Sequence, residues 1–317
     1  MRDYRPGPAA GGGGSITRVD VRGYLAEEIA LDHADGLLSR RDALRRLALM
    51  GFTVAAASAL LAACGSASSP TLAPVTPVTP RPTATPHGPG SVPPAQAITY
   101  PGPAGTLQGA WAAAASPRGG VLVIHQNTGL TDQIRTVVAR LAADGFSALA
   151  PDLLSEEGGT ASLGDPAQAT AALARVPEER FVADMRAGVD ELARRQPGAR
   201  LAAIGFCFGG GQVWSLLAAG EARLAAAVPF YGPCPATPDF SGSRGAAVLA
   251  IYAGLDDRVL ATRDRCVAAL QAAGNVHEVR VFPGVNHAFF DDSGPRYDAA
   301  AAAEAYRATL DWLGRHA

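Results

Sequence analysis

The sequence contains no lysine, because all of its basic residues are arginine. Any mechanism that needs a catalytic lysine is therefore excluded. The formal net charge is −2 and charged residues make up 18% of the chain, so no basic excess exists to hold a phosphate backbone, which argues against nucleic-acid binding. The chain has four cysteines and no CxxC or HExxH pattern. We therefore expect neither a disulfide-rich scaffold nor a structural zinc site.

What the chain does have is apolar residues, at 48% of 317 positions. This composition is typical of a globular protein and excludes full-length disorder, collagen and a coiled coil. The length allows one large domain or two small ones. The sequence divides into an N-terminal region at 1–64, a segment rich in Pro, Ser and Thr at 65–95, and a domain of about 220 residues at 96–317.

The N-terminal region has the pattern of an export signal. Paired arginines, Arg40 and Arg41, precede an uncharged apolar run of 17 residues from Leu47 to Ala63, which ends at Cys64. A basic region, an apolar core and small residues before a cleavage point are typical of such signals, and the arginine pair resembles the twin-arginine type. The ending Leu-Ala-Ala-Cys resembles a bacterial lipobox, which predicts a membrane-anchored lipoprotein lipidated at Cys64 and exported from the cytoplasm. An uncleaved membrane anchor and a buried core helix are the alternatives.

The segment at 65–95 holds nine Pro and nine Ser or Thr. It cannot bury enough apolar surface to offset the entropy lost on ordering, and we expect an extended tether. A short amphipathic helix is expected earlier, at 24–38, and the folded domain is expected to start near Gln96.

The domain alternates apolar strand-like runs with helical ones. Strands are expected at 107–114, 120–125, 146–150, 199–206, 225–231, 247–252 and 277–282, and helices at 132–144, 178–195, 211–219, 262–273 and 299–313. This alternation predicts an α/β fold with a mainly parallel sheet covered by helices on both faces. Functional sites in such sheets form at the carboxyl ends of the strands.

The stretch 205–211 reads Gly-Phe-Cys-Phe-Gly-Gly-Gly and lies between an expected strand and an expected helix. This is the pattern of a nucleophile elbow with Cys207 at its tip, where small neighbours are needed because the turn is sharp. The positive end of the following helix favours a thiolate. A glycine-rich phosphate loop and a tight turn with a buried cysteine are the alternative interpretations.

An elbow predicts an acid and then a histidine farther along the chain, each following a strand. Asp256 and Asp257 follow the strand expected at 247–252, and His287 follows the one at 277–282. We expect His287 to take the thiol proton and later to activate water, while the acid orients it. The spacing alone leaves the acid open between Asp256 and Asp257.

A third loop, after the strand at 120–125, is where such folds place one donor of an oxyanion hole. We expect the backbone N–H groups of Asn127 and Phe208 to form this hole. A simple glycine turn is the alternative for this loop. His125, at the end of the strand, is expected to be a hydrogen-bonded structural residue and not a second base.

These motifs together resemble the dienelactone hydrolase family of α/β-hydrolases, over roughly residues 105–317. The resemblance is carried by His-Gln-Asn-Thr-Gly-Leu at 125–130, Ala-Pro-Asp-Leu at 150–153, the cysteine elbow, Phe-Tyr-Gly at 230–232, Gly-Leu-Asp at 254–256 and Asn-His-Ala-Phe at 286–289. It implies a hydrolase that cleaves an ester or lactone through a Cys207–His287–Asp256 triad, without a cofactor. It also favours Asp256 over Asp257, and places Gln126 and Tyr231 as candidates for the substrate pocket.

The sequence departs from the family pattern at two points. The family usually has a glutamate at the position of Gln126, where it helps to deprotonate the thiol, and a glutamine cannot accept that proton. We therefore expect His287 to activate Cys207 directly. Family members that act on dienelactone hold its carboxylate with arginines, but no arginine occurs within 151–157 or next to His287. A neutral ester or lactone is expected at least as much as an anionic one.

Two rival functions follow from these departures. One is a catalytically silent ligand-binding module on the same fold, and the other is acyl transfer to an acceptor other than water. Cys234 and Cys266 lie in the expected exported domain, where a disulfide can form, but buried free thiols are the expected state. The sequence contains no metal-binding pattern and leaves the oligomeric state open.

Overall fold

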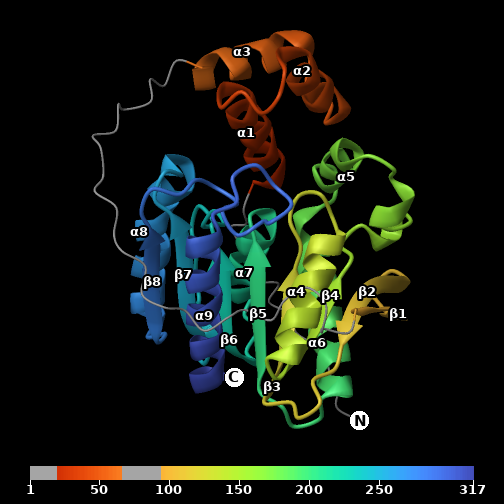
Figure 1. The fold of residues 1–317 in the computed structure, drawn as a ribbon, viewed down its shortest axis with the longest axis vertical. Helices are drawn as coiled ribbons and strands as arrows, with labels where there is room; N and C mark the ends of the chain where they lie inside the picture. The colour runs from red at the N-terminus through yellow and green to blue at the C-terminus, as the bar shows by residue number, and fades with distance from the viewer. Residues whose placement is uncertain (1–19, 66–93) are drawn as a thin grey trace, which may run out of the picture.

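A computed structural model describes residues 20–65 and 94–317 of the chain (Figure 1). Within these residues eight strands form one sheet in the order β1-β2-β4-β3-β5-β6-β7-β8. The strands are β1 (Gln96–Pro101), β2 (Thr106–Ala112), β3 (Gly119–Ile124), β4 (Phe146–Pro151), β5 (Leu201–Phe206), β6 (Leu224–Phe230), β7 (Ala247–Ala253) and β8 (His277–Phe282). In this order, every pair of neighbouring strands from β4 to β8 is parallel. At the other edge, β2 pairs antiparallel with both β1 and β4. The mainly parallel α/β fold expected from the sequence is confirmed.

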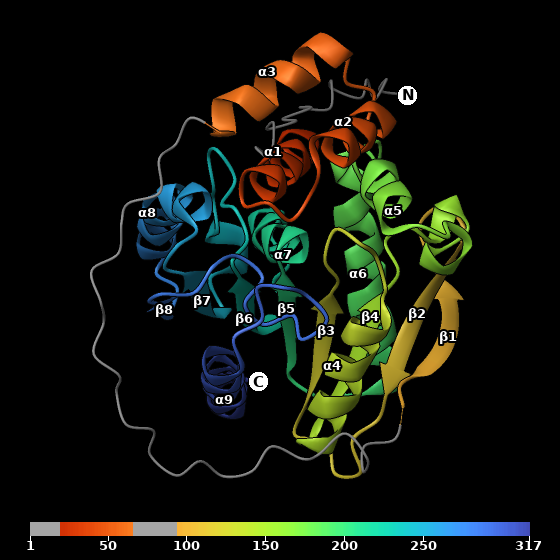
Figure 2. The same cartoon turned by 45° about the horizontal axis from the view of Figure 1, so that its top comes forward.

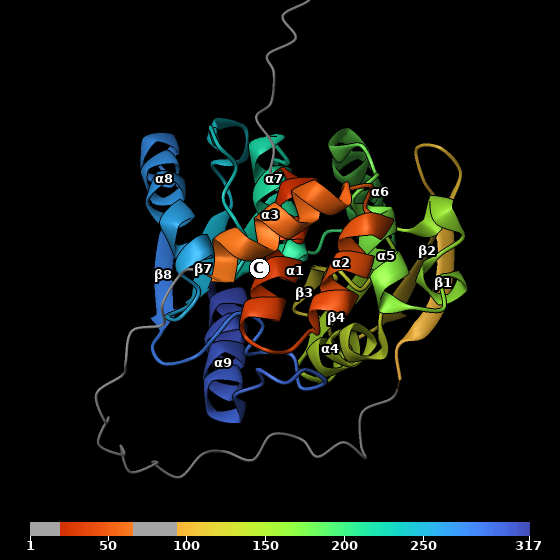
Figure 3. The ribbon, with the colours of Figure 1, turned by 90° about the horizontal axis from the view of Figure 1, so that it is seen from above.

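Helices cover both faces of this sheet. Figure 3, which views the sheet from above, shows α4 and α9 on one face and α6, α7 and α8 on the other. The helices are α4 (Asp132–Ala143), α5 (Pro166–Leu173), α6 (Glu178–Arg195), α7 (Phe208–Ala218), α8 (Asp257–Ala273) and α9 (Ala299–His316). Because both faces are covered, every residue of β3, β4, β5 and β7 is buried.

Two helices start earlier than the sequence indicates. The helix expected at 211–219 begins at Phe208, directly after Cys207, although its first turn contains three glycines. The helix expected at 262–273 begins at Asp257. Glycine is a poor helix former. In the first turn of α7, however, neighbouring backbone lies too close for a larger residue, and this packing outweighs the low helix propensity of glycine. Strand β1 and helix α5 were not expected at all.

Residues 20–65, which precede the domain expected to start near Gln96, are also helical. These residues form three helices, α1 (Val21–Ala34), α2 (Arg40–Leu49) and α3 (Val54–Gly65), with α1 close to the helix expected at 24–38. Figures 2 and 3 show them lying over the carboxyl ends of the central strands. Leu25 and Leu47 are fully buried there. The N-terminal helices are therefore packed at the carboxyl ends of the strands.

The apolar run 47–63 is divided between two helices, because α2 ends at Leu49 and α3 starts at Val54. Among the described residues, none of the helices combines the length and the hydropathy needed to cross a bilayer. The tether expected at 65–95 falls almost entirely outside the described residues.

Cys234 and Cys266 form a disulfide, which corrects the expectation of free thiols. The bond joins the loop after β6 to α8, and both residues are buried. The sequence could not show this pairing because 32 positions separate the two residues and neither lies in a diagnostic pattern.

Candidate active site

Cys207 lies at a sharp turn between β5 and α7. Its backbone has φ 58° and ψ −120°, a combination that non-glycine residues rarely adopt. The turn depends on glycines with no room for a side chain: a Cβ on Gly205 would lie 2.2 Å from the carbonyl oxygen of Gly209, and one on Gly209 would lie 2.4 Å from that of Ile124. The strained backbone presents the sulfur at the carboxyl end of the sheet.

His287 and Asp256 approach the same place from the loops after β8 and β7. The His287 Nδ1 and an Asp256 carboxylate oxygen are 2.5 Å apart. The other Asp256 oxygen accepts a hydrogen bond from the backbone N–H of Val259 and so caps α8. Asp257 is exposed on the first turn of α8, so of the two acids left open by the spacing it is Asp256 that contacts the imidazole.

The sulfur and the imidazole lie close together in a buried setting. The Cys207 Sγ and a ring nitrogen of His287 lie within 4.8 Å of one another, and both side chains are buried. Burial and the neighbouring Glu28 raise the pKa of the Cys207 thiol above its ordinary value. Burial alone would lower the pKa of His287, but Glu28 and Asp256 raise it well above that value. With Glu28 in place, both shifts favour an imidazolium beside a neutral thiol.

The two loops expected to form the oxyanion hole lie side by side. Phe208 is the first residue of α7, and Gly209 packs against the carbonyl groups of Ile124 and His125, at the end of β3. The rings of His125 and Phe208 have their centroids 6.1 Å apart. Asn127, two residues beyond His125, is held by its carbonyl oxygen, which accepts a hydrogen bond from the Thr170 hydroxyl.

Gln126 and Tyr231 are both buried at the edge of this site. The Gln126 side-chain amide donates to Asp291 at 2.8 Å, which directs its nitrogen to that carboxylate. The Tyr231 ring lies 5.0 Å from that of His287, and its backbone also has a positive φ, 35°. Its buried hydroxyl has no hydrogen-bond partner among the described residues.

His125 is a structural residue, as expected. It is fully buried, its Nδ1 lies 2.6 Å from the carbonyl oxygen of Gln126, and its Nε2 accepts from the Leu153 N–H at 3.1 Å. Burial lowers the pKa of this imidazole, so the neutral form is favoured. Both ring nitrogens are used in holding two loops together.

Two side chains of α1 reach Cys207 and His287, which sequence analysis did not predict. The Tyr24 hydroxyl lies 3.4 Å from the Cys207 Sγ and 3.4 Å from the His287 Nε2. The Glu28 carboxylate oxygens lie 3.4 and 3.5 Å from the same sulfur. Burial alone would raise the pKa of Glu28, but His287 and Arg258 lower it, so this group is a carboxylate.

Arginines lie near the site, contrary to what the sequence positions suggest. The Arg258 guanidinium lies 3.3 Å from Glu28 and stacks on the Tyr24 ring at 4.3 Å. Arg180 donates to Glu157 at 2.8 Å and to the carbonyl oxygen of Leu153, beside the loop at 151–157. Chain folding brings Arg180 to a loop that contains no arginine itself, and Arg258 to helix α1.

Glu28, Cys207 and His287 each offer an atom that could ligate a metal. All three atoms also have hydrogen-bonding neighbours within the constellation, and the second nitrogen of His287 is bound to Asp256. The set fits a nucleophile and its base. The expected absence of a metal or cofactor stays a prediction.

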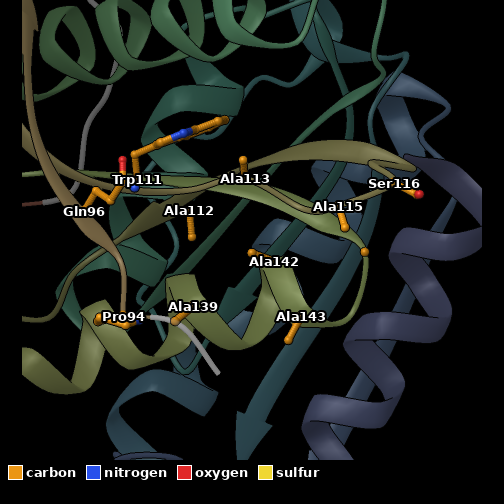
Figure 4. A pocket seen from close by; sticks show the side chains of 11 residues that line it. Pro94, Gln96, Trp111, Ala112, Ala113, Ala115, Ser116, Ala139, Ala142 and Ala143 are labelled. Carbon is orange, nitrogen blue, oxygen red and sulfur yellow. The ribbon is translucent and has the colours of Figure 1, made fainter. Parts of the chain in front are cut away.

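A surface pocket of about 540 Å³ lies away from the triad, between β2 and α4 (Figure 4). Its wall is largely alanine, with Trp111, Gln96 and Ser116 at its margins. No titratable side chain lines it. The pocket therefore offers none of the acid–base groups that hydrolysis needs.

Comparison with known proteins assigns the chain to a family. Residues 107–317 match the family model described as Dienelactone hydrolase family. The chain belongs to the dienelactone hydrolase family. This dienelactone hydrolase homologue is 34% identical over 209 residues to a protein of Escherichia coli O157:H7 that carries the name carboxymethylenebutenolidase, covering 62% of this chain and 76% of the relative.

Solved structures agree with this assignment. A dienelactone hydrolase of Klebsiella pneumoniae subsp. pneumoniae MGH 78578 superposes with a TM-score of 0.63 at 27% identity, covering 70% of this chain and 98% of the other. A dienelactone hydrolase-like promiscuous phosphotriesterase from metagenomic libraries gives a TM-score of 0.56 at 26% identity, with the same shares covered. The family match starts at residue 107, so α1, α2 and α3 precede it.

Cys64 lies in the last turn of α3, half-buried and free of any disulfide. Its expected lipidation stays a prediction. The residues that sequence analysis missed are Tyr24, Glu28 and Arg258. An interval of four between Tyr24 and Glu28 was the one available signal, and it places both on one helix face without saying what that face meets.

Proposed function

We propose that the chain hydrolyses a carboxylic ester or lactone through a thioester on Cys207. The sulfur attacks the carbonyl carbon while His287 takes the thiol proton, and the N–H groups of Asn127 and Phe208 hold the oxyanion. The C–O bond to the leaving group breaks and His287 donates the proton to that oxygen. Water then attacks the thioester, His287 accepts its proton, and the thiolate leaves.

One observation carries this proposal. Cys207 stands at a positive φ between a buried strand and a helix, with His287 beside it and Asp256 at 2.5 Å from the imidazole. A backbone strain of this kind is kept where the surrounding structure over-determines it, and such positions cluster at active sites. A merely structural buried cysteine has no need of an adjacent carboxylate–imidazole pair.

Activation of the thiol is assigned to His287, because Gln126 cannot accept a proton and points to Asp291. The rate of Cys207 alkylation against pH, in the parent chain and in His287→Ala, measures this. We expect the variant to lose the reaction at lower pH and to follow an ordinary thiol. Coincident profiles would show that His287 does not set the thiolate population.

Arg258 narrows the class of substrate that we propose. Its guanidinium contacts Glu28, and Glu28 in turn contacts the sulfur of Cys207. A cation there favours an acyl compound that carries a carboxylate near its scissile bond. The name of the E. coli relative fits a butenolide of that kind. Comparing kcat/KM for a lactone and its carboxylated analogue, in the parent and in Arg258→Met, tests this. A preference unchanged by Arg258→Met contradicts it.

The hydrolysis itself is tested with a p-nitrophenyl ester. We expect a burst of p-nitrophenolate stoichiometric with enzyme, and its loss in Cys207→Ala. Both the uncut chain and a chain cut between residues 66 and 93 are assayed, because α1 contacts the sulfur. No burst with any short acyl ester in either form would favour the silent binding module. Product analysis with added alcohols separates hydrolysis from acyl transfer.

We also propose that the chain is exported as a lipoprotein, cleaved before Cys64 and lipidated there. Arg40, Arg41, the apolar run and the Leu-Ala-Ala-Cys ending support this, and so does the disulfide, because disulfides persist in oxidising compartments. Labelling with a radioactive fatty acid tests it, with Cys64→Ala as the matched control. Equal labelling of both chains, or none of either, contradicts the proposal.

A further inference from the structure

Helix α1 lies across the triad and not merely near it. Tyr24, Glu28 and Asp32 are spaced by four residues, so they form one stripe along the helix. The first two contact the sulfur and the imidazole, and all three are opposite residues of the catalytic domain. Figure 2 shows α1 at the top of the sheet, above α7.

The contacts along this stripe are complementary in charge. Glu28 pairs with Arg258 at 3.3 Å, and Asp32 and Asp35 pair with Arg296 at 2.8 and 2.6 Å. Arg258 also donates to the carbonyl oxygen of Tyr24. The acidic face of α1 therefore fits a pair of arginines at the mouth of the site.

Helix α1 also has a buried apolar side. Leu25 and Ile29 keep 0% and 3% of their surface exposed. The helix packs chiefly against α3 and α2, and it also contacts α5 of the domain below. The three N-terminal helices therefore form one packed unit, which carries the stripe of α1 over the site.

The docked helix occupies the place that a substrate needs. A reacting acyl carbon must come to about 3–3.5 Å from the sulfur, with its leaving oxygen within hydrogen-bond reach of the imidazole. The Tyr24 hydroxyl holds both positions, at 3.4 Å from Sγ and 3.4 Å from Nε2. Cys207 retains 1% of its surface exposed.

Glu28 also changes the charge balance of the site. The groups that act on His287 are Glu28, Tyr24 and Asp32 from α1, Asp256 at the start of α8, Tyr231 and Cys207. Glu28 serves as a second anion beside the imidazolium and raises the pKa of the sulfur. A thiol flanked by this carboxylate is a poor nucleophile.

We propose that α1 is an inhibitory segment that fills the active site of the unprocessed chain, and that hydrolysis of the peptide bond before Cys64 allows it to leave. The inference rests on the proposed hydrolase and its processing. The segment precedes the family match, while the triad lies within it. Export would thereby couple removal of the signal to opening of the site.

Access to Cys207 is the direct test, because alkylation needs no substrate. The full chain carries Cys64→Ser, which leaves Cys207 as the free thiol and blocks processing. We expect iodoacetamide to react about tenfold or more faster with Tyr24→Ala/Glu28→Ala than with this parent. Glu27→Ala is the matched control, since Glu27 is exposed on the same helix, and it should react like the parent.

A second variant guards against misfolding of α1 itself. Arg296→Glu places a like charge opposite Asp32 and Asp35 and leaves the triad untouched, so it should also speed alkylation. A chain cut by a site-specific protease within 70–85 should become more reactive on dilution, as the released segment dissociates.

The outcomes separate the two proposals. A parent that reacts as fast as the variants overturns the inhibition, and so does a double variant that reacts more slowly, which would make Glu28 a part of the thiol-activating machinery. Faster alkylation without ester hydrolysis in any form leaves the inhibition standing and removes the proposed hydrolase. Equal rates of ester hydrolysis through Cys207 in all chains would support the proposed hydrolase and overturn the inhibition.

Discussion

Two parts of the chain meet at the sulfur of Cys207, and they differ in how they are held there. From below, β5 and α7 fix the nucleophile through backbone contacts that leave no room for a side chain at Gly205. From above, α1 approaches through side chains, a hydroxyl, a carboxylate and ion pairs with Arg258 and Arg296. The sheet fixes the position of Cys207 through its backbone, whereas α1 is held by side-chain contacts, which under our proposal can be released to expose the thiol.

This difference predicts effects of opposite sign. Changes on the sheet side should lower activity or stability, while those on α1 should raise the reactivity of the thiol. The largest loss is expected for Cys207→Ala, assayed in the cut chain. Removing the nucleophile should lower kcat about 10³-fold or more, because the remaining groups can only bind and polarise the ester.

The melting temperature of Cys207→Ala is the control, and it should change little since the smaller residue keeps the turn. Undiminished turnover by this variant would show that Cys207 is not the nucleophile.

Asp256→Asn should give the next largest loss, about 10²- to 10⁴-fold in kcat, since the amide cannot hold the imidazole in the required tautomer or stabilise its charge. The kcat/KM of the cut chain measures it. Asp257→Asn is the matched control, one residue away and exposed. Similar losses in both variants would indicate a general effect of charge and contradict the assigned pair.

Gly205→Ala tests the backbone part of the comparison. Its Cβ would lie 2.2 Å from the Gly209 carbonyl oxygen, so we expect the free energy of unfolding to fall by about 3 kcal/mol or more. Urea denaturation measures this. Gly245→Ala, with no atom within 4 Å of the added Cβ, should change stability by less than about 0.5 kcal/mol. Equal stability of the two variants would show that the turn is not tightly packed.

The smallest expected effect on the site comes from the disulfide. Replacing Cys234 and Cys266 by serine reopens a loop of 32 residues and should lower the free energy of unfolding by about 2–4 kcal/mol, mainly through the unfolded chain. Thiol alkylation of Cys207 should stay unchanged, because neither residue contacts the triad. A large change in that rate would link the disulfide to the site.

The sheet side was predictable because its signals are local. A nucleophile between small residues, followed in order by an acid and a histidine after further strands, gave Cys207, Asp256 or Asp257, and His287 from sequence alone, and the parallel sheet brings them together. The first turn of α7, from Phe208, was missed, since three glycines argue against a helix until the neighbouring backbone is known.

The α1 side could not be predicted, because its contacts join residues far apart in the chain. Glu28 and Cys207 are separated by 179 positions, and an acidic residue on an amphipathic helix has the pattern of a solvated face. Arg258 was similarly hidden, because only the fold turns it towards α1. Charge complementarity between distant segments leaves no periodic trace in a sequence.

Peptide mapping after quenched incubation with an activated ester tests the central claim most directly, because it identifies the atom that carries the acyl group. The account predicts one acyl group per cut chain, attached to Cys207, and lost on standing in water as product forms. An enzyme that turns over the ester while its acyl group is found on another residue would contradict the account.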